Sequence, residues 1–345
     1  MISNMNLYKS DINESLEKNN YEELKNKTIL IVGARGLIGS SIIDVLNYLN
    51  EKYNYNINII GTVRDNNKIP ERFFLYNNLE IINYDVNCKL EMNKNIHYVI
   101  NAASNSHPKS FSQDPSGTII TNFIGTKNLL DFVKENHCER LLYVSSGEIY
   151  GQGTEDLASF KEDYSGYIDS TNPRSCYPLG KLSAENLCAT YTSQFNVDTV
   201  IARPCHTYGP TQTESDSRVS AQFINNVLDD KDIIMKSEGL QIRSYMYVID
   251  CVTGLLKILT KGEKGQAYNV SNNNSVISIR EMAEIIAGIC NKKVVFELPS
   301  KKEKKGYNPV TKSVLDGSKL EKLGWEPCFD FKEGIKHTLK IMKKM

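Results

Sequence analysis

The sequence predicts an α/β fold, in which a doubly wound parallel sheet is followed by a smaller mixed C-terminal domain. Short apolar segments alternate with longer amphipathic segments from residue 28 onward, a pattern typical of parallel strands with helices on both faces. Three regularly spaced glycines follow the first apolar segment directly. The alternation stops at Tyr208-Gly209-Pro210, a turn signal after which the segments become shorter and more varied.

Six strands are expected before that turn, at Thr28–Val32, Ile57–Val63, Leu79–Tyr84, His97–Asn101, Arg140–Ser145 and Thr199–Arg203. Three helices are expected after it, at Ser220–Asp229, Ile279–Cys290 and Lys332–Met342. The charged segment Pro299–Gly306 predicts an exposed loop. Such a loop is either plain solvated surface or a segment that closes over a ligand.

Composition and charge exclude several classes of function. Lys plus Arg and Asp plus Glu both number 41, so the basic excess of a nucleic-acid binder is missing. The first 27 residues contain no continuous apolar run, so we expect no secretory signal, no membrane span and a cytoplasmic location. The eight cysteines and five histidines are scattered, so no metal site and no disulfide framework are expected.

The strongest motif is the segment Thr28-Ile-Leu-Ile-Val-Gly33-Ala-Arg-Gly36-Leu-Ile-Gly39. A strand that runs into three spaced glycines and then a helix predicts a Rossmann-like dinucleotide site, with the pyrophosphate at the helix N-terminus. We therefore expect an N-terminal extension with a surface helix at 1–26 and a dinucleotide-binding domain at 27–208. A mainly substrate-binding domain at 209–345 follows, and it can return the chain to the sheet.

The second strand is expected to end at Val63-Arg64-Asp65, where the cofactor ribose is normally recognised. An acid at this place accepts hydrogen bonds from the 2′-hydroxyl of NAD, whereas an arginine favours the 2′-phosphate of NADP. Arg64 gives a slight preference for NADP over NAD, but Asp65 beside it keeps both cofactors open. Arg64 could equally be exposed or stacked on the adenine.

Tyr177 and Lys181 stand four residues apart at the start of a helical pattern, hence on one helix face. A phenol is a poor base at neutral pH, and a neighbouring cation is expected to lower its pKa towards the working range. The strand expected at Arg140–Ser145 ends in hydroxyls, Ser145 and Ser146, at the edge of the sheet where active sites of this architecture form.

Together, the glycine motif, the hydroxyls and the Tyr-Lys pair resemble the extended short-chain dehydrogenase/reductases of the nucleotide-sugar epimerase/dehydratase family. The resemblance runs from Thr28 to the C-terminus and includes Leu323-Gly-Trp-Glu-Pro327, which is similar to a C-terminal signature of the family. It implies that Ser146 is the family's hydroxyl, Tyr177 its catalytic base and Lys181 the partner of that base. It also implies a homodimer, formed through the helices expected at Thr126–Glu135 and Tyr177–Gln194.

The same resemblance implies which residues hold the cofactor. Besides Tyr177, Lys181 and Arg64, these are Gly33, Gly36, Leu37, Ile38, Gly39, Asp85, Val86, Ala102, Ala103, Ser104, Asn122 and Pro204.

For the substrate, a nucleotide-diphosphate sugar, the resemblance implies three positions. His206 stands where the family usually has asparagine. Arg243 lies in a segment similar to one that grips the substrate diphosphate, although a surface ion pair is the alternative. Lys312 occupies the place where decarboxylases of glucuronate sugars carry an arginine.

The resemblance further implies oxidation at C4 of the sugar, followed by chemistry at C5 that depends on Glu148. The first choice is 4,6-dehydration, although Gly147 replaces an aspartate that is common in dehydratases. The alternatives are C4 epimerisation, glucuronate-sugar decarboxylation, 4-ketoreduction, or a dinucleotide-binding protein without turnover. Glu148 could also be a strand-end carboxylate that only bonds to the backbone.

Overall fold

The computed structural model of the chain describes residues 2–154, 156–297 and 311–343. The loop expected at Pro299–Gly306 lies outside the described residues.

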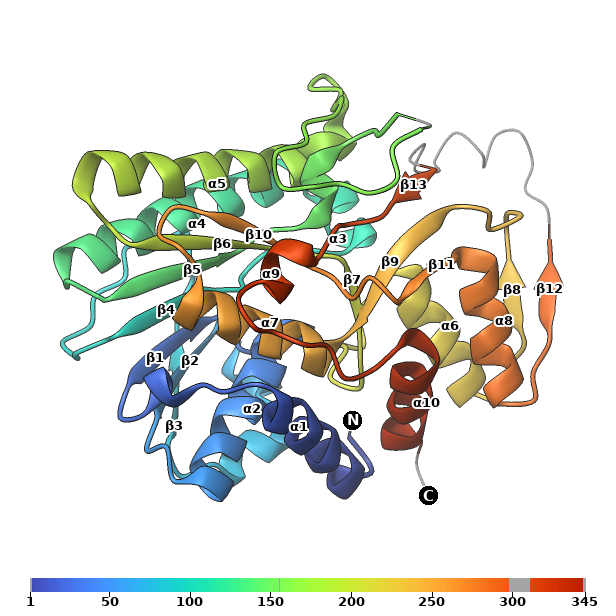
Figure 1. The fold of residues 1–345 in the computed structure, drawn as a ribbon, viewed down its shortest axis with the longest axis horizontal. Coiled ribbons are helices and arrows are strands. Elements are labelled where there is room, and N and C mark those ends of the chain that lie inside the picture. Colours follow the sequence, from blue (N-terminus) through green and yellow to red (C-terminus); the bar gives the residue numbers. More distant parts are fainter. Residues whose placement is uncertain (1, 155, 298–310, 344–345) are drawn as a thin grey trace.

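The larger part of the molecule is built on a seven-stranded parallel sheet with the order β3-β2-β1-β4-β5-β6-β10 (Figure 1). The expected α/β fold with a doubly wound sheet is confirmed, and the six expected strands agree with the observed bounds to within one residue. The strands are β1 (Thr28–Val32), β2 (Asn58–Val63), β3 (Leu79–Asn83), β4 (Tyr98–Asn101), β5 (Arg140–Val144), β6 (Thr199–Pro204) and β10 (Ala267–Val270).

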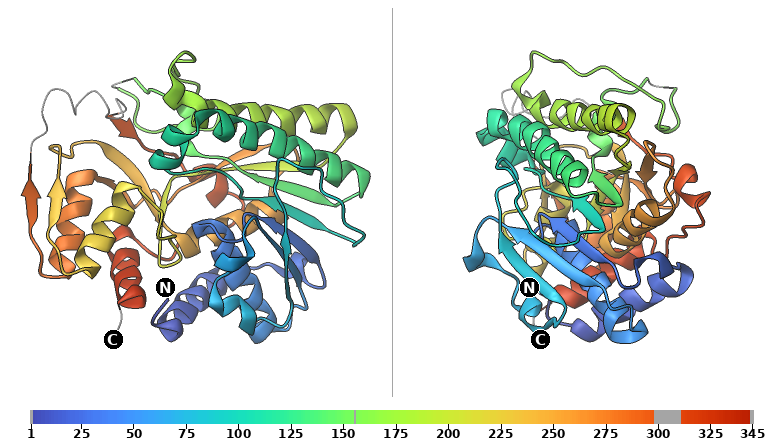
Figure 2. Two further views of the ribbon diagram at one scale, coloured as in Figure 1. Left: turned by 180° about the vertical axis from the view of Figure 1, so that it is seen from behind. Right: turned by 90° about the vertical axis from the view of Figure 1, so that its left-hand side faces the viewer.

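Helices cover both faces of this sheet, as Figures 1 and 2 show from three sides. On one face, α2 (Leu37–Tyr53) packs against α7 (Val248–Lys261). On the other, α4 (Pro115–Glu135) packs along α5 (Cys176–Phe195). The sheet is buried between these layers, which explains why β1 and β5 are almost uninterrupted apolar runs. Each fully buried aliphatic side chain contributes roughly 1.5–3 kcal/mol.

The C-terminal region returns the chain to this sheet. Strand β10 pairs with β6 in parallel, with Ala267 opposite Ile201 and Val270 opposite Pro204. Helix α7 precedes β10 and has twelve buried residues, so it is a central helix of the larger layer. Residues of the C-terminal region therefore complete both the sheet and one of its helical faces.

The remaining C-terminal elements form the smaller part, drawn on the right of Figure 1. A four-stranded sheet contains β7 (His206–Tyr208), β9 (Ile242–Tyr247), β11 (Val276–Ser278) and β13 (Lys312–Ser313), and β8 (Ile233–Met235) pairs with β12 (Val294–Phe296). Its helices are α6 (Val219–Leu228), α8 (Ile279–Ile289) and α10 (Phe331–Met342), whereas the short α9 (Ser318–Glu321) packs against β10 and α7 of the larger part. A capping box formed by Ser278 and Glu281 fixes the start of α8.

The expected N-terminal helix is present as α1 (Met5–Lys18), but one of its faces is buried. Tyr8, Ile12 and Leu16 join the main hydrophobic core. The Tyr8 hydroxyl donates to Asp44 at 2.9 Å. The N-terminal extension is thus packed against the larger part of the molecule.

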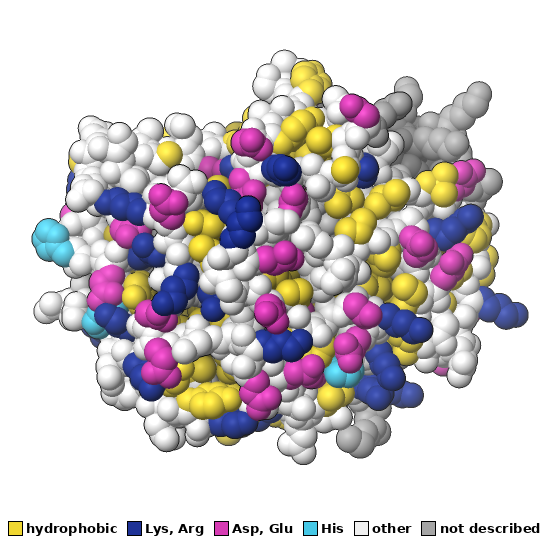
Figure 3. Space-filling model, viewed as in Figure 1, with side chains coloured by type: hydrophobic (Ala, Val, Ile, Leu, Met, Phe, Trp, Pro, Cys, Tyr) yellow, Lys and Arg dark blue, Asp and Glu magenta, His cyan; other side chains and the backbone are white. Residues whose placement is uncertain are grey.

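Short elements complete the chain: α3 (Pro108–Gln113) and the 3-10 helices η1 (Glu22–Leu24), η2 (Asn66–Lys68), η3 (Glu71–Leu75), η4 (Gly147–Tyr150) and η5 (Pro173–Ser175). On the face drawn in Figure 3, basic and acidic side chains are interspersed. No helix within the described residues has the length and apolar character needed to cross a membrane.

Candidate active site

Two cavities lie at the carboxyl ends of the central strands, where β1 is flanked by β2 on one side and β4 on the other. This is the switch point at which doubly wound sheets bind ligands. The first cavity reaches Ser146, Glu148, Tyr177 and Lys181. The second extends along the ends of β1 and β2 to Arg64. The two cavities have several lining residues in common, namely Gly36, Ala102, Ser104, His107 and Thr213, so they form one continuous cleft.

The glycine motif is shaped as a cradle for a dinucleotide. Gly33 has φ +92°, and a Cβ atom added there would lie 2.9 Å from the backbone of Ala102. A Cβ atom on Gly39 would lie 2.2 Å from the carbonyl oxygen of Gly33. Gly36 is the N-cap of α2 and provides no side-chain cap, so the first N–H groups of the helix remain available to an anion. These features fit a dinucleotide pyrophosphate.

The structure distributes the expected cofactor residues over this cleft. Gly36, Leu37, Ile38, Gly39 and Pro204 line the first cavity, whereas Gly33, Arg64, Val86 and Ala103 line the second. Asp85 is not brought to the cavity, because its exposed carboxylate accepts the backbone N–H of Asn87 at 3.0 Å. Tyr84 and Val86 line the wall there instead.

Asn122 does not line the cleft but contacts a residue that does. Its buried Oδ1 accepts the hydroxyl of Ser104 at 3.0 Å, and its Nδ2 donates to the Thr118 carbonyl at 2.8 Å. Asn122 therefore holds the side chain of Ser104, which lines both cavities.

The ribose end of the cleft contains two arginines, Arg35 and Arg64. The Asp65 carboxylate is already engaged, because it accepts the backbone N–H of Asn67 at 3.0 Å and pairs with Lys68 at 3.3 Å. It also does not line the second cavity.

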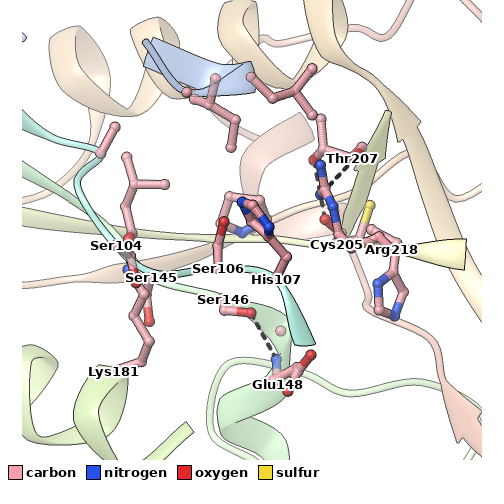
Figure 4. Close-up of a pocket in the computed structure, with 18 of the residues that line it drawn as sticks. Ser104, Ser106, His107, Ser145, Ser146, Glu148, Lys181, Cys205, Thr207 and Arg218 are labelled. Carbon is pink, nitrogen blue, oxygen red and sulfur yellow. Dashed lines mark hydrogen bonds between the residues drawn. The ribbon is translucent and has the colours of Figure 1, made fainter. Parts of the chain in front are cut away.

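The hydroxyl, phenol and ammonium predicted from the sequence meet in the first cavity, part of which is drawn in Figure 4. The Ser146 hydroxyl accepts the backbone N–H of Glu148 at 3.2 Å, which caps η4 directly after β5. Tyr177 and Lys181 lie one turn apart at the start of α5. The ammonium of Lys181 is buried, donates to the Val144 carbonyl at 2.7 Å and lies 5.9 Å from the centre of the Tyr177 ring.

Burial controls the protonation of this pair. It lowers the pKa of Lys181 to about 7, although Glu185 acts in the opposite direction. It raises the pKa of the Tyr177 phenol, the Glu148 carboxyl raises that pKa further, and a hydrogen bond from Ser146 partly opposes the rise. The expectation that Lys181 lowers the phenol pKa is therefore not met in the protein alone. The physical reason is that desolvation dominates while the lysine ammonium is directed at the Val144 carbonyl.

Glu148 is partly buried beside the phenol, and burial raises its pKa, while Arg174 and then Arg243 act to lower it. Two other described carboxyls line the cavities around it. Asp216 pairs with Arg218, and Asp169 accepts hydrogen bonds from Thr171, so both have lowered pKa values. Among the described carboxyls lining these cavities, Glu148 is thus the one held towards its protonated form. No hydrogen bond from a described backbone N–H reaches its carboxylate.

The three expected substrate residues differ in placement. His206 lines the first cavity, and burial followed by Arg243 and Arg218 keeps its pKa well below the usual value. Its Nε2 lies 3.3 Å from a guanidinium nitrogen of Arg243, so the neutral ring accepts that hydrogen bond.

Arg243 itself lines an adjoining chamber that shares Gly147, Glu148 and Ser313 with the first cavity. Lys312 lines neither space. It pairs with Ile242 at the start of β13, and Ser313 presents the opposite face.

Besides Arg35, sequence reasoning missed Arg174, Arg218 and His107 among the residues of the cleft. Arg174 precedes Tyr177 by three positions and lines the adjoining chamber. Arg218 donates to the Thr207 carbonyl at 3.0 Å and lies in the first cavity with His107 (Figure 4). Each of these residues lies next to a motif that was analysed, but in a connection without periodicity. The sequence signal that could have identified them is a charged or imidazole side chain close to the end of a predicted strand or helix.

Comparison with known proteins identifies the family of the chain. Residues 29–271 match the model of the NAD dependent epimerase/dehydratase family. UDP-glucuronic acid decarboxylase 1 of Xenopus tropicalis is 30% identical over 324 residues, which cover 93% of this chain and 73% of that protein. UDP-glucuronic acid decarboxylase 5 of Arabidopsis thaliana is 31% identical over 312 residues, covering 90% and 87%.

An epimerase structure from Methanothermobacter thermautotrophicus has the same fold, with a TM-score of 0.80 at 22% identity over 94% of both chains. The resemblance inferred from the motifs is confirmed by the family match over residues 29–271. The chain belongs to the NAD dependent epimerase/dehydratase family and is an enzyme of that family.

Proposed function

We propose that the enzyme oxidises C4 of a nucleotide-diphosphate sugar and then acts at C5 and C6. One observation carries this proposal: Ser146, Glu148, Tyr177 and Lys181 line one cavity that is continuous with the glycine cradle. Tyr177 takes the proton of the 4-hydroxyl while Ser146 hydrogen-bonds that oxygen. A nicotinamide dinucleotide held by the glycine cradle would supply the hydride acceptor and donor for C4 and, in its oxidised form, positive charge beside the phenol.

For the second step, decarboxylation of a uronate sugar fits these side chains best. A 4-ketone makes the C6 carboxylate a β-keto acid. The C5–C6 bond then breaks, carbon dioxide leaves, and its electron pair is held as the enolate of the ketone. The remaining requirement is one acid that returns a proton to C5, and Glu148 suits this task because burial raises its pKa and so favours the protonated form. The names of the relatives from Xenopus tropicalis and Arabidopsis thaliana point to the same substrate class.

The 4,6-dehydration expected from the sequence remains the second candidate. It needs a base at C5 and an acid at the 6-hydroxyl, and Gly147 can provide neither. Glu148 would have to remove the C5 proton and then deliver it to the leaving hydroxyl. This candidate is favoured only if neutral sugars are converted.

The mass of the product distinguishes these reactions. Incubation with UDP-glucuronate is expected to give a product that has lost carbon dioxide, and incubation with UDP- or dTDP-glucose is expected to give no loss of water. Loss of water from the neutral sugars would contradict the decarboxylase proposal in favour of dehydration. Unchanged mass with inverted C4 would indicate epimerisation, and stoichiometric consumption of added reduced cofactor would indicate 4-ketoreduction.

We also propose NADP as the preferred dinucleotide, because Arg35 and Arg64 line the ribose end of the cleft while Asp65 is engaged elsewhere. Two guanidinium groups favour a 2′-phosphate over a 2′-hydroxyl. Fluorescence titration should give tighter binding of NADPH than of NADH, and Arg64→Ser should reduce the difference. Tighter NADH binding by the unaltered enzyme would contradict this preference.

A homodimer is proposed through α4 and α5. The outer side of α4 exposes a row of apolar side chains, Ile119, Ile120, Phe123 and Ile124, each at least 36% exposed. A contiguous apolar face of this kind is typical of an interface. Light scattering should give twice the chain mass, and Phe123→Glu should give the monomer mass, whereas a monomeric unaltered protein would exclude the proposal.

A further inference from the structure

The adjoining chamber beside Glu148 contains charges that the C4 chemistry does not use. It lies between η4, η5 and the start of β9 and β13. Its wall combines apolar surface with several polar side chains, namely Gln152, Asp169, Asn172, Arg174, Arg243 and Ser313. Because it shares Glu148 with the catalytic cavity, a group attached to C5 of a bound sugar could reach into it.

Neither arginine of this chamber is neutralised. Within the described part of the chain, the arginines in ion pairs are Arg72, Arg140, Arg203 and Arg218. Arg174 and Arg243 are absent from that set. Asp169 lies in the chamber wall, but its carboxylate is held by the backbone N–H and hydroxyl of Thr171 at 3.0 and 2.8 Å. The chamber therefore presents two unpaired guanidinium groups, which together favour an anionic ligand.

Arg174 is held in place by an aromatic ring instead of an acid. Its guanidinium lies 5.4 Å from the centre of the Phe111 ring. Phe111 in turn stacks on Tyr177, with ring centres 5.5 Å apart and an interplanar angle of 19°. This arrangement orients the guanidinium while leaving its N–H groups free to donate. The cation is thereby coupled structurally to the catalytic phenol.

We propose that Arg174 is the residue that binds the C6 carboxylate of a uronate sugar, the role that the sequence had assigned to Lys312. This inference rests on the proposed decarboxylation. The carboxylate is attached to C5, so it must lie close to the acid that protonates C5. Of the two chamber arginines, Arg174 is tied through the Phe111 ring to the catalytic Tyr177 and also has the larger electrostatic effect on Glu148, so it lies in the better position for that carboxylate. Arg243, whose guanidinium is hydrogen-bonded to His206, remains for the diphosphate.

The contact should act on binding more than on the rate of bond breaking. A guanidinium stabilises the carboxylate of the bound substrate, and this stabilisation is lost when neutral carbon dioxide leaves. Removing Arg174 should therefore raise KM for the uronate sugar by roughly ten- to a hundredfold, the effect of one charge-assisted contact, without a comparable fall in kcat. A neutral sugar nucleotide should bind equally well with and without it.

The test is calorimetric binding of UDP-glucuronate and UDP-glucose to the enzyme saturated with reduced dinucleotide, which cannot accept a hydride and therefore allows no turnover. Arg174→Gln should weaken UDP-glucuronate binding by ten- to a hundredfold, leave UDP-glucose unchanged, and be partly restored by Arg174→Lys. The matched control is Arg280→Gln, which removes another guanidinium stacked on a ring, 4.7 Å from Phe296, and should change neither affinity.

Three results would overturn the assignment: no effect of Arg174→Gln, equal loss for both nucleotides, or selective loss on Lys312→Gln instead. These results can be distinguished from failure of the proposed function. If the unaltered enzyme releases carbon dioxide but Arg174→Gln binds UDP-glucuronate normally, the Arg174 assignment alone fails. If the unaltered enzyme neither prefers UDP-glucuronate nor releases carbon dioxide, the decarboxylase proposal fails as well.

Discussion

Lys181→Met should become progressively more stable than the unaltered protein as the pH falls, while its turnover is abolished. Lys181 is 2% exposed, and its burial lowers the pKa from 10.5 to about 7. As the pH falls from 10.5 towards 7, the unfolded chain binds a proton at this lysine that the folded protein does not bind. The stability of the folded state therefore falls over this window and no longer changes below it. Methionine has a similar length and carries no such penalty.

The size of the effect follows from the two pKa values. At ~1.4 kcal/mol per pH unit, Lys181 costs the folded protein on the order of 3 kcal/mol more at pH 6 than at pH 9. The Val144 carbonyl loses its donor in the variant, at a cost of about 1–3 kcal/mol, but this cost does not depend on pH. Other titrating groups are common to both proteins and cancel in the difference.

The assay is urea unfolding of both proteins without added dinucleotide at pH 6, 7, 8 and 9. The difference between the free energies of unfolding, Lys181→Met minus the unaltered protein, should increase by about 3 kcal/mol as the pH falls over this range. Turnover of the variant should be lost at every pH. Parallel stability profiles would refute the reasoning, because they would mean that burial does not shift the protonation of Lys181.

Three further predictions concern single residues. Gly39→Ala should weaken dinucleotide binding about tenfold or more in a fluorescence titration, since its Cβ would meet the Gly33 carbonyl at 2.2 Å; unchanged affinity would argue against the cradle. Glu148→Gln should lower turnover by roughly 10²–10⁴ yet preserve single-turnover reduction of the dinucleotide, and equal loss of both would exclude a role at C5. His206→Leu should raise KM for the nucleotide sugar about tenfold by freeing Arg243, whereas His206→Asn, which keeps an acceptor, should be milder; equal effects would contradict that role.

The sheet was largely predictable because its strands are buried on both faces. Leu30 and Leu142, for example, are 0% exposed within continuous apolar runs, which alternate clearly with the amphipathic helices. Strand β10 gave no such signal. It is four residues long and contains Asn269, whose amide accepts the Tyr150 hydroxyl at 2.6 Å and donates to the Phe160 carbonyl. A polar residue buried by long-range hydrogen bonds cannot be recognised from local periodicity.

The site likewise contains residues that could be predicted from the sequence and residues that could not. Tyr177 and Lys181 could be paired from the sequence because helical spacing alone places them on one face. The adjoining chamber could not be predicted, since it depends on how η5 approaches β9, whose residues are far away in the chain. Lys312 shows why a position taken over from a family motif can be wrong by one residue. A difference of one position in β13 decides which side chain faces the chamber, and that position belongs to Ser313.

Rapid mixing of the oxidised holoenzyme with UDP-glucuronate tests the central claim, hydride removal from C4 with Tyr177 as the base. The near-ultraviolet absorbance of reduced nicotinamide should rise transiently and then decay as product forms. Tyr177→Phe should bind the nucleotide sugar but reduce the dinucleotide at least about a hundredfold more slowly. Reduction at an unchanged rate in Tyr177→Phe would contradict the account.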